Sequence, residues 1–226
     1  MEYSKKQPFL VGDIHGCFFE FMDLLETLNY DSQKHRLILM GDIINRGPHS
    51  WEMLQWVKIH NVEAIQGNHE EAFTRFARRN RPITPALDEL KQQMGKDLED
   101  WLTWIESWPL YIEEEDFIAV HAGLAPEKHP KDSDIRTLLY IRTWDEKNKT
   151  LGDSSHPPWY EFYKGNKLII YGHWAKQGLQ VRQNTIGLDS GCVYGKKLSG
   201  ILLPERKIFQ VPARQNYCSP ARDGFF

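Results

Sequence analysis

The first third of the chain alternates short apolar runs with segments whose apolar residues recur at helical spacing. The runs lie at 9–11, 36–40 and 62–65, and each is followed by a glycine within two residues. Segments with helical spacing come after them, at about 17–28, 49–60 and 70–79. A strand followed by a helix, three times in succession, predicts a parallel sheet with right-handed crossovers.

The rest of the chain has a different pattern. Residues 86–106 are amphipathic and predict one long helix, whereas 110–112 and 117–120 flank an acidic turn and predict a hairpin. A short helix is expected at 133–141. Further strands are expected at 168–171, 185–188, 198–203 and 207–211. The segment after Pro212 has no periodicity, and we expect it to be loosely held.

Composition narrows the class of protein. The chain of 226 residues suits a single domain, 1–226, and we expect a helical insert at about 80–109. Its 28 Lys and Arg against 31 Asp and Glu give no reason to expect binding to nucleic acid or to an anionic membrane. No apolar run is long enough to cross a bilayer, and three widely spaced cysteines indicate reduced thiols. We therefore expect a cytoplasmic protein, and its oligomeric state is left open.

Side chains that can bind metal ions follow the predicted strands. They are Asp13 and His15, Asp42, Asn68 and His69, His121, and His173. In open α/β sheets, ligands bind outside the carboxyl ends of the strands. One such fragment alone is explained as well by a capping or hydrogen-bonded residue, but the same pattern at five strand ends is not. The sequence therefore predicts that these side chains converge on one site.

The types of these side chains indicate which chemistry the site supports. Carboxylate, amide and imidazole ligands without thiolate suit manganese or iron and tolerate zinc, whereas magnesium prefers all-oxygen shells. The chain has no GxSxG elbow and no GxxxxGK phosphate loop. The predicted nucleophile is therefore water, whose pKa a bound metal can lower from about 15.7 to near 7.

Five short motifs carry a resemblance to a known family. They are GDIHG at 12–16, GDIINRG at 41–47, GNHE at 67–70, VHAG at 120–123 and YGHW at 171–174. In this order the chain resembles the calcineurin-like metallophosphoesterases, over about residues 9–174, and GLDSGCVYGKKL at 187–198 resembles the closing strands of one branch. That branch holds bacterial serine/threonine phosphoprotein phosphatases and symmetrical diadenosine-tetraphosphate hydrolases. The resemblance implies an α/β fold with a central two-sheet β-sandwich flanked by helices, of which the predicted parallel sheet is only a part.

The resemblance also implies roles for individual residues. It implies two divalent metal ions, with manganese expected and iron or zinc as alternatives. The implied ligands are Asp13, His15 and the bridging Asp42 for the first ion, and Asp42, Asn68, His121 and His173 for the second. His69 would be the general acid that protonates the leaving group. Arg46 and Arg142 would grip the phosphate, since a guanidinium binds phosphate oxygens bidentately.

One position departs from the phosphatase pattern. Asn45 stands where the protein phosphatases usually have Asp, which orients the catalytic histidine and supports its positive charge. We expect Asn45 to accept a hydrogen bond from His69 without supplying charge, which makes His69 a weaker base. A tetraphosphate leaving group tolerates this loss better than a serine alkoxide does. GPHS at 47–50 and the stretch 84–126 also resemble the tetraphosphate hydrolases more than the protein phosphatases. Glu70 and the short chain instead favour a protein phosphatase.

The predicted function is therefore a two-metal hydrolase acting on dinucleoside tetraphosphates, such as diadenosine tetraphosphate. The alternative is a serine/threonine or dual-specificity phosphoprotein phosphatase. A non-catalytic scaffold that binds a phosphorylated partner is disfavoured, because all seven metal and acid positions hold competent residues. Trp101, Trp104 and Trp108 recur at helical spacing and could stack an adenine, but packing in the core of the insert is the preferred interpretation.

Overall fold

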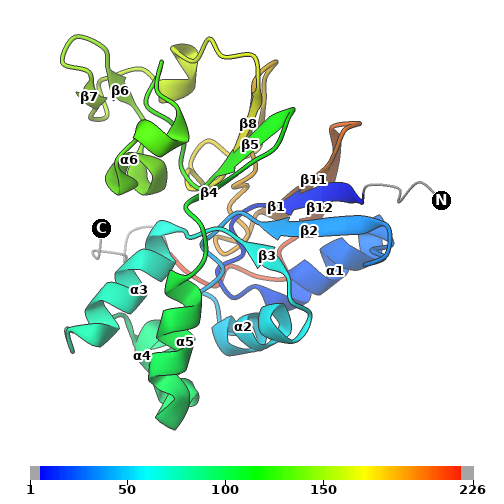
Figure 1. The fold of residues 1–226 in the computed structure, drawn as a ribbon. Coiled ribbons are helices and arrows are strands. Elements are labelled where there is room, and N and C mark those ends of the chain that lie inside the picture. The colour runs from blue at the N-terminus through cyan, green and yellow to red at the C-terminus, as the bar shows by residue number, and fades with distance from the viewer. Residues whose placement is uncertain (1–5, 220–226) are drawn as a thin grey trace.

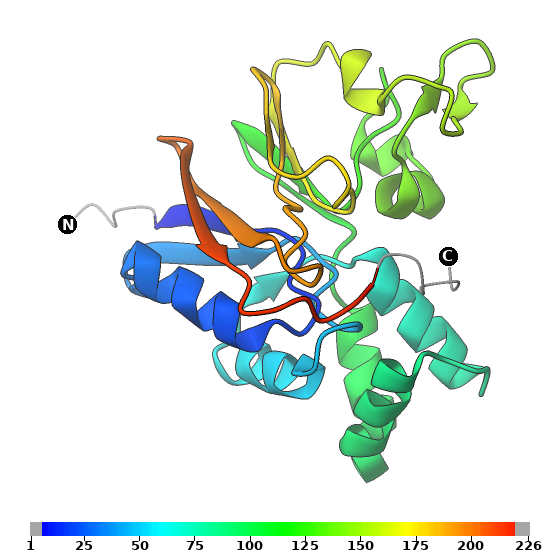
Figure 2. The same cartoon turned by 180° about the vertical axis from the view of Figure 1, so that it is seen from behind.

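The computed structural model describes residues 6–219. Two five-stranded sheets pack face to face, and helices cover their outer faces (Figure 1). The view from behind shows the two sheets splayed apart at one end, with the C-terminal strands on the near side (Figure 2). This mixed α/β sandwich is the fold class that the sequence predicts.

The first sheet contains the predicted parallel strands. Its order is β12-β11-β1-β2-β3. The strands are β1 (Gln7–Val11), β2 (His35–Leu39), β3 (Glu63–Ala64), β11 (Lys197–Leu202) and β12 (Lys207–Pro212). β1, β2 and β3 run parallel, joined by α1 (Phe18–Leu28) and α2 (Ser50–Ile59), which confirms the predicted crossovers. β11 and β12 extend the sheet in antiparallel fashion beside β1.

The second sheet is built from the middle of the chain. Its order is β4-β5-β8-β10-β9. The strands are β4 (Tyr111–Glu113), β5 (Phe117–Val120), β8 (Leu168–Tyr171), β9 (Gln180–Val181) and β10 (Thr185–Gly187). β4 and β5 form the predicted hairpin, and β8 lies parallel to β5 and β10. Its outer face carries η2 (Pro130–Asp132), α6 (Ile135–Tyr140), β6 (Trp144–Asp145), β7 (Thr150–Leu151) and η3 (Trp159–Glu161).

Period-two alternation along the strands builds three layers of core. Leu10 and Ile38 from the first sheet meet Ala119 and Ile170 from the second in the layer between the sheets. The alternate residues of the first sheet pack against α1 and α2, and those of the second sheet pack against α6 and η3. Both faces of both sheets are therefore covered, which holds the strand ends rigidly in place.

The prediction of one long helix at 86–106 is wrong, because the structure has two helices there. In chain order, α3 (Asn68–Arg78) comes before this region, which consists of α4 (Pro85–Met94), η1 (Gly95–Asp97) and α5 (Leu98–Glu106). Gly95 has φ 55° and ψ −129°, a backbone conformation that is open to glycine and that ends α4. The apolar periodicity continues across this break, so the pattern alone does not reveal it.

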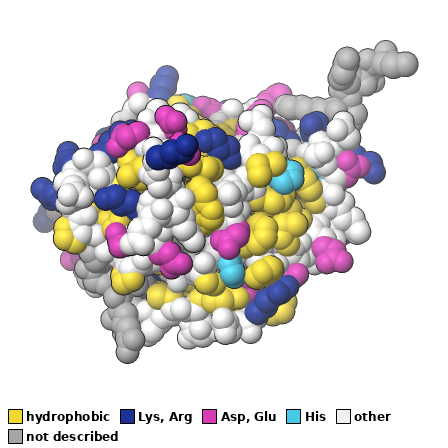
Figure 3. Space-filling view, turned by 90° about the horizontal axis from the view of Figure 1, so that it is seen from below, with side chains coloured by type: hydrophobic (Ala, Val, Ile, Leu, Met, Phe, Trp, Pro, Cys, Tyr) yellow, Lys and Arg dark blue, Asp and Glu magenta, His cyan; other side chains and the backbone are white. Residues whose placement is uncertain are grey.

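The tryptophans of this helical region pack against one another. The ring of Trp104 lies 5.4 Å from that of Trp101 and 5.1 Å from that of Trp108, and all three contact the core of the first sheet. Seen from below, the apolar side chains of this face are interspersed with charged ones (Figure 3). The packing role that we preferred for the tryptophans agrees with these contacts.

The segment 213–219 is not loosely held, contrary to expectation. The Arg214 backbone N–H and the Tyr217 hydroxyl both donate to Glu20 Oε1, at 2.9 and 2.7 Å, and the Tyr217 N–H donates to the Val193 carbonyl at 3.0 Å. Residues 220–226 lie outside the described part. Across 6–219, no helix has the length and apolar character needed to span a membrane.

Candidate active site

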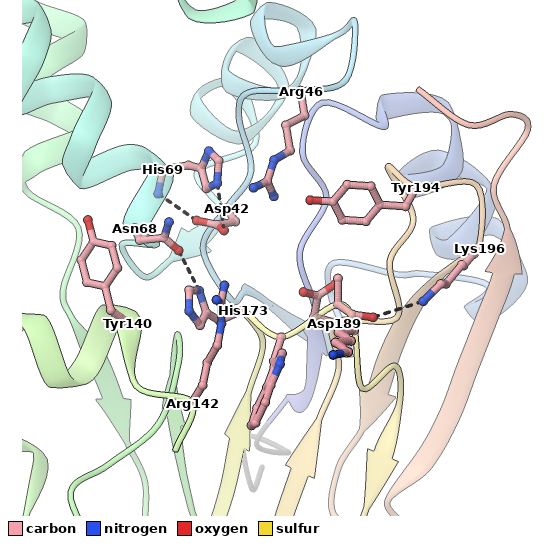
Figure 4. A pocket seen from close by; sticks show the side chains of 13 residues that line it. Asp42, Arg46, Asn68, His69, Tyr140, Arg142, His173, Asp189, Tyr194 and Lys196 are labelled. Atoms are coloured by element: carbon pink, nitrogen blue, oxygen red, sulfur yellow. Dashed lines mark hydrogen bonds and ion pairs between the residues drawn. The ribbon is translucent and has the colours of Figure 1, made fainter. Parts of the chain in front are cut away.

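The polar side chains predicted to converge do so at one edge of the sandwich. They follow β1, β2, β3, β5 and β8, whose carboxyl ends meet there. The side chains are Asp13, His15, Asp42, Asn68, His69, His121 and His173, and all are buried. Figure 4 shows Asp42, Asn68, His69 and His173 pointing toward one another in the wall of a cavity.

Two groups of possible metal ligands share Asp42. In the first, one ligand atom each from His15, Asp42 and His69 lie within 4.8 Å of one another. His15 Nε2 is 3.6 Å and His69 Nε2 is 3.8 Å from Asp42 Oδ2. A carboxylate placed between two sets of donors in this way has the geometry of a bridging ligand.

The second group lies on the other oxygen of the same carboxylate. It consists of Asp42, His121 and His173, again within 4.8 Å of one another. His121 Nε2 is 3.4 Å from Asp42 Oδ1. Asn68 Oδ1 lies 2.9 Å from His121 Nε2 and 2.8 Å from His173 Nδ1, so the amide oxygen belongs to this group.

Asp13 lies beside these groups but is bound differently. Both of its carboxylate oxygens accept a hydrogen bond from the His173 backbone N–H, at 3.0 Å. Burial raises the pKa of Asp13 well above its ordinary value, and the nearby Asp189 carboxylate raises it further. A buried carboxylate that repels its neighbours in this way is the kind of group that a cation would stabilise.

The contacts behind the imidazoles orient them toward the site. His15 Nδ1 lies 3.1 Å from the Ile44 carbonyl, and His121 Nδ1 lies 2.9 Å from the Met40 carbonyl. A carbonyl can only accept, so Nδ1 carries a proton in both rings, and Nε2 is the nitrogen that faces the site. Hydrogen bonds of this kind are typical of histidines that bind metal ions.

The electrostatics of the site fit a divalent cation. Burial alone would raise the pKa of Asp42, but the His121 imidazole, through its charge and its hydrogen bond, holds it well below its ordinary value. Burial lowers the pKa of His15, and the Arg46 guanidinium lowers it further. Burial also acts to lower the pKa of His121, but Asp42 outweighs this and raises it to about 10. Anionic and neutral oxygen and nitrogen donors without thiolate are thus concentrated in one buried place.

The backbone at the site is strained. His15, Asp42, Asn45, Arg46 and His173 all have positive φ, between 49° and 74°. The left-handed conformation costs a non-glycine residue about 1–2 kcal/mol. Residues held in it gather at functional sites, where the surrounding structure fixes them.

Two glycines make room for the carboxylates. A Cβ on Gly67 would overlap Asp42 Oδ1, and a Cβ on Gly172 would overlap Asp13 Oδ1. Glycine at these positions therefore reflects close approach of a site carboxylate to the backbone of the next strand end.

A buried glutamate ties two of the strand ends together. Glu70 accepts hydrogen bonds from the backbone N–H groups of Asp42, Ile43 and Ile44, at 2.8, 2.9 and 3.2 Å, and from that of Gly67, at 2.9 Å. One carboxylate thus holds the turn after β2 against the start of α3. No local pattern in the sequence indicates this positioning role of Glu70.

The contact between Asn45 and His69 runs opposite to the prediction. Asn45 Nδ2 lies 2.8 Å from His69 Nδ1, and Asn45 Oδ1 accepts from the Arg46 N–H and the Thr84 hydroxyl, both at 2.8 Å. A backbone N–H can only donate, so the amide oxygen is fixed on that side and the amide nitrogen faces the imidazole. Asn45 therefore donates to His69, and the imidazole proton lies on Nε2.

A cavity of about 610 Å³ opens over these residues. The predicted phosphate-binding residues Arg46 and Arg142 both line it, together with Lys176 and Lys196. Arg46 Nη1 lies 2.9 Å from His15 Nε2, so the guanidinium reaches the metal-ligand groups. Four cationic side chains around a buried carboxylate and imidazole site favour a polyanionic ligand.

Several residues of the cavity were missed in the sequence. Asp189 is buried, and burial raises its pKa to about 6. It follows β10 within GLDSG, so the strand-end rule would have found it if applied to the C-terminal strands. Lys176, Tyr194 and Lys196 have no such signal, because they lie on irregular segments around the site, and Tyr140 has none, because it is the last residue of the helix α6.

Comparison with known proteins identifies the family. The family model described as Calcineurin-like phosphoesterase matches residues 9–177. The chain belongs to the calcineurin-like phosphoesterase family. It is therefore a hydrolytic metallophosphoesterase, and the family implies divalent metal ions, for which the two groups around Asp42 are the candidates.

Relatives within the family cover nearly the whole chain. A symmetrical bis(5'-nucleosyl)-tetraphosphatase from Methylobacillus flagellatus is 30% identical over 94% of this chain and 96% of its own. The asymmetrical bis(5'-nucleosyl)-tetraphosphatase PrpE from Bacillus mycoides is 33% identical over 90% and 93%. A crystal structure assigned as a diadenosine tetraphosphatase has a TM-score of 0.82 at 27% identity, covering 94% of this chain and 96% of that one. A serine/threonine phosphatase from Saccharomyces cerevisiae shares the fold, with a TM-score of 0.64 at 16% identity over 92% and 79%.

Proposed function

We propose that this phosphoesterase hydrolyses dinucleoside tetraphosphates with two divalent metal ions. The observation that carries the proposal is that two ligand groups share Asp42 on the floor of a cavity surrounded by four cationic side chains. The names of relatives at 30% and 33% identity support the same substrate class. A tetraphosphate carries several negative charges, so it would be held more strongly there than a single phosphate group.

The proposed ligands are those implied by the sequence. They are Asp13, His15 and Asp42 for one ion, and Asp42, Asn68, His121 and His173 for the other. Divalent ions bound there would polarise a phosphoryl oxygen and lower the pKa of water, and manganese fits the mixed oxygen and nitrogen donors, with iron or zinc as alternatives. His69 also belongs to the first ligand group by distance, so it lies close to the reacting phosphate.

The cationic side chains bind and orient the substrate. Arg46 and Arg142 would hold phosphoryl oxygens through paired N–H groups. Lys176 and Lys196 would neutralise the neighbouring phosphates of the chain. Holding the phosphate chain at several points fixes which phosphorus atom faces the nucleophile.

His69 would donate its Nε2 proton in a hydrogen bond to the leaving oxygen. Asn45 presents an N–H group to Nδ1, so a second proton at Nδ1 is disfavoured and the imidazole stays neutral. A neutral imidazole is a poorer acid than an imidazolium, which suits a phosphate leaving group better than a serine alkoxide. This favours phosphoanhydride hydrolysis over the phosphoprotein phosphatase alternative.

The test is a comparison of substrates on enzyme stripped of metal and reloaded with manganese. We expect kcat/KM for diadenosine tetraphosphate to exceed that for a phosphoserine peptide by at least about a hundredfold, roughly 2.7 kcal/mol in transition-state stabilisation. A preference of that size for the peptide would instead assign the chain as a phosphoprotein phosphatase.

The cellular setting and the domain organisation are also proposals. Cys17 and Cys192 are buried free thiols, which fits the reducing cytoplasm. We further propose that the chain is a single domain and that α4 and α5, which lie between β3 and β4 in sequence, form an insert into it.

A further inference from the structure

A second cavity of about 980 Å³ adjoins the one over the metal-ligand groups. The two share the wall residues Tyr140, Arg142, Trp174 and Lys176. We call the second space the distal cavity. The two cavities therefore lie side by side, with Arg142 and Lys176 between them.

The distal cavity is positively charged. Arg136, Arg142 and Lys176 line it, and within residues 6–219 no acidic side chain forms an ion pair with any of the three. Of its two acidic residues, Glu71 pairs with Arg75 at 2.7 Å and Asp153 lies 2.9 Å from His156, so the lysine and arginine side chains of the lining outnumber the carboxylates. The charge left over suits a ligand that carries phosphate groups.

The same cavity offers flat apolar surfaces. Trp174 is partly buried in the shared wall, and the hydroxyl of Tyr140 is held by a hydrogen bond to Glu71 Oε2 at 3.1 Å. Leu151 and Pro158 add apolar lining. Aromatic rings held in place beside cations form the surface on which a nucleobase stacks while its phosphates are neutralised.

We propose that the distal cavity binds the nucleotide at the far end of the substrate, beyond the phosphate that is attacked. The proposal rests on the proposed function. A phosphate monoester fills only the space over the metal-ligand groups, whereas a dinucleoside polyphosphate needs a second space for its second nucleoside. Each cavity has the size of an ordinary small-molecule site, and the cations of the shared wall lie where the phosphate chain would cross.

Two variants test the distal cavity without touching the residues over the metal-ligand groups. Arg136→Glu reverses a charge that lines the distal cavity but not the cavity over the metal-ligand groups, and Ser154→Trp places a large ring in the distal cavity. Their matched controls are Arg79→Glu, on an exposed residue after α3, and Ser32→Trp, on an exposed loop residue. We expect both distal variants to raise KM for diadenosine tetraphosphate about tenfold, the size of one lost charged contact, with kcat/KM for p-nitrophenyl phosphate unchanged. The controls should change neither substrate.

The outcomes separate this proposal from the proposed function. If the wild type hydrolyses diadenosine tetraphosphate and both distal variants keep its KM, the distal cavity does not bind the far nucleotide. If the variants raise KM only for a phosphoserine peptide, the cavity serves a protein substrate and the proposal is overturned. A wild type that turns over p-nitrophenyl phosphate but no dinucleotide would contradict the proposed function itself, and the distal-cavity proposal with it.

Discussion

The side-chain amide of Asn45 donates a hydrogen bond to Nδ1 of His69, 2.8 Å away. The Arg46 N–H fixes this direction, because it can only donate and it occupies the amide oxygen of Asn45. His69 therefore carries its proton on Nε2, the atom that faces Asp42. Asparagine in place of aspartate at position 45 therefore determines where His69 holds its proton, and through it which leaving groups the enzyme can protonate.

Asn45→Asp should broaden the range of leaving groups. A carboxylate would accept from Nδ1–H and favour an imidazolium, which is a stronger acid. We expect kcat on phenyl phosphate, a poor leaving group, to rise about tenfold relative to kcat on p-nitrophenyl phosphate. Plotting log kcat against leaving-group pKa checks this through its slope. An unchanged slope in Asn45→Asp would contradict the assigned proton position, and Asn45→Ala is the control for loss of the contact.

Thr84 should act as a positioning residue for the Asn45 amide. Its hydroxyl donates to Asn45 Oδ1 and caps α4 by accepting from the Leu87 N–H. Thr84→Val should lower kcat about threefold to tenfold with KM unchanged, and lower the free energy of unfolding by about 1 kcal/mol through loss of the cap. Thr84→Ser should restore both. A loss of stability with full kcat would reduce Thr84 to a helix cap.

Glu70→Gln should destabilise the strand ends. Glutamine keeps the shape but has one acceptor oxygen fewer for the four backbone N–H groups that Glu70 binds. Leaving buried donors unpaired costs about 1–3 kcal/mol, so we expect the free energy of unfolding to fall by about 2 kcal/mol. Urea denaturation measures it, with the neighbouring Glu71→Gln as control. An equal fall in the free energy of unfolding for Glu70→Gln and Glu71→Gln would show that the buried contacts of Glu70 contribute no more to stability than those of Glu71.

Gly172→Ala should weaken metal binding. The added methyl group would overlap Asp13 Oδ1 and displace the carboxylate or the strand end. We expect manganese affinity, measured by calorimetry, to fall at least about tenfold. Gly178→Ala is the control, because the Cβ position of Gly178 has open space around it, even though its φ of 68° strains an added side chain. Equal losses in both variants would show that the crowding of Asp13 is not the cause.

Much of the site was predictable because it obeys a local rule. A buried strand that ends at a glycine beside a polar residue can be recognised from a few neighbouring positions, as at Asp13, Asp42 and His121. Parallel strands then bring these ends to one edge whatever the rest of the chain does. Asp189 obeys the rule as well, and it was missed only because the rule was confined to the earlier strands.

Other features depend on contacts that no local pattern encodes. The direction of the Asn45–His69 hydrogen bond is set by Arg46 and Thr84, the latter far away in sequence. The end of α4 at Gly95 depends on one backbone conformation inside a continuous periodicity. The distal cavity likewise forms from the irregular segment around α6 and the loop after β8, where no periodic signal exists.

The sharing of Asp42 between two ligand groups can be examined directly by diffraction. Crystals of protein reloaded with manganese should give anomalous difference peaks at the manganese absorption edge. We predict two peaks on opposite sides of the Asp42 carboxylate, one beside His15 and the other beside His121 and His173. A single peak, or peaks away from Asp42, would contradict this prediction.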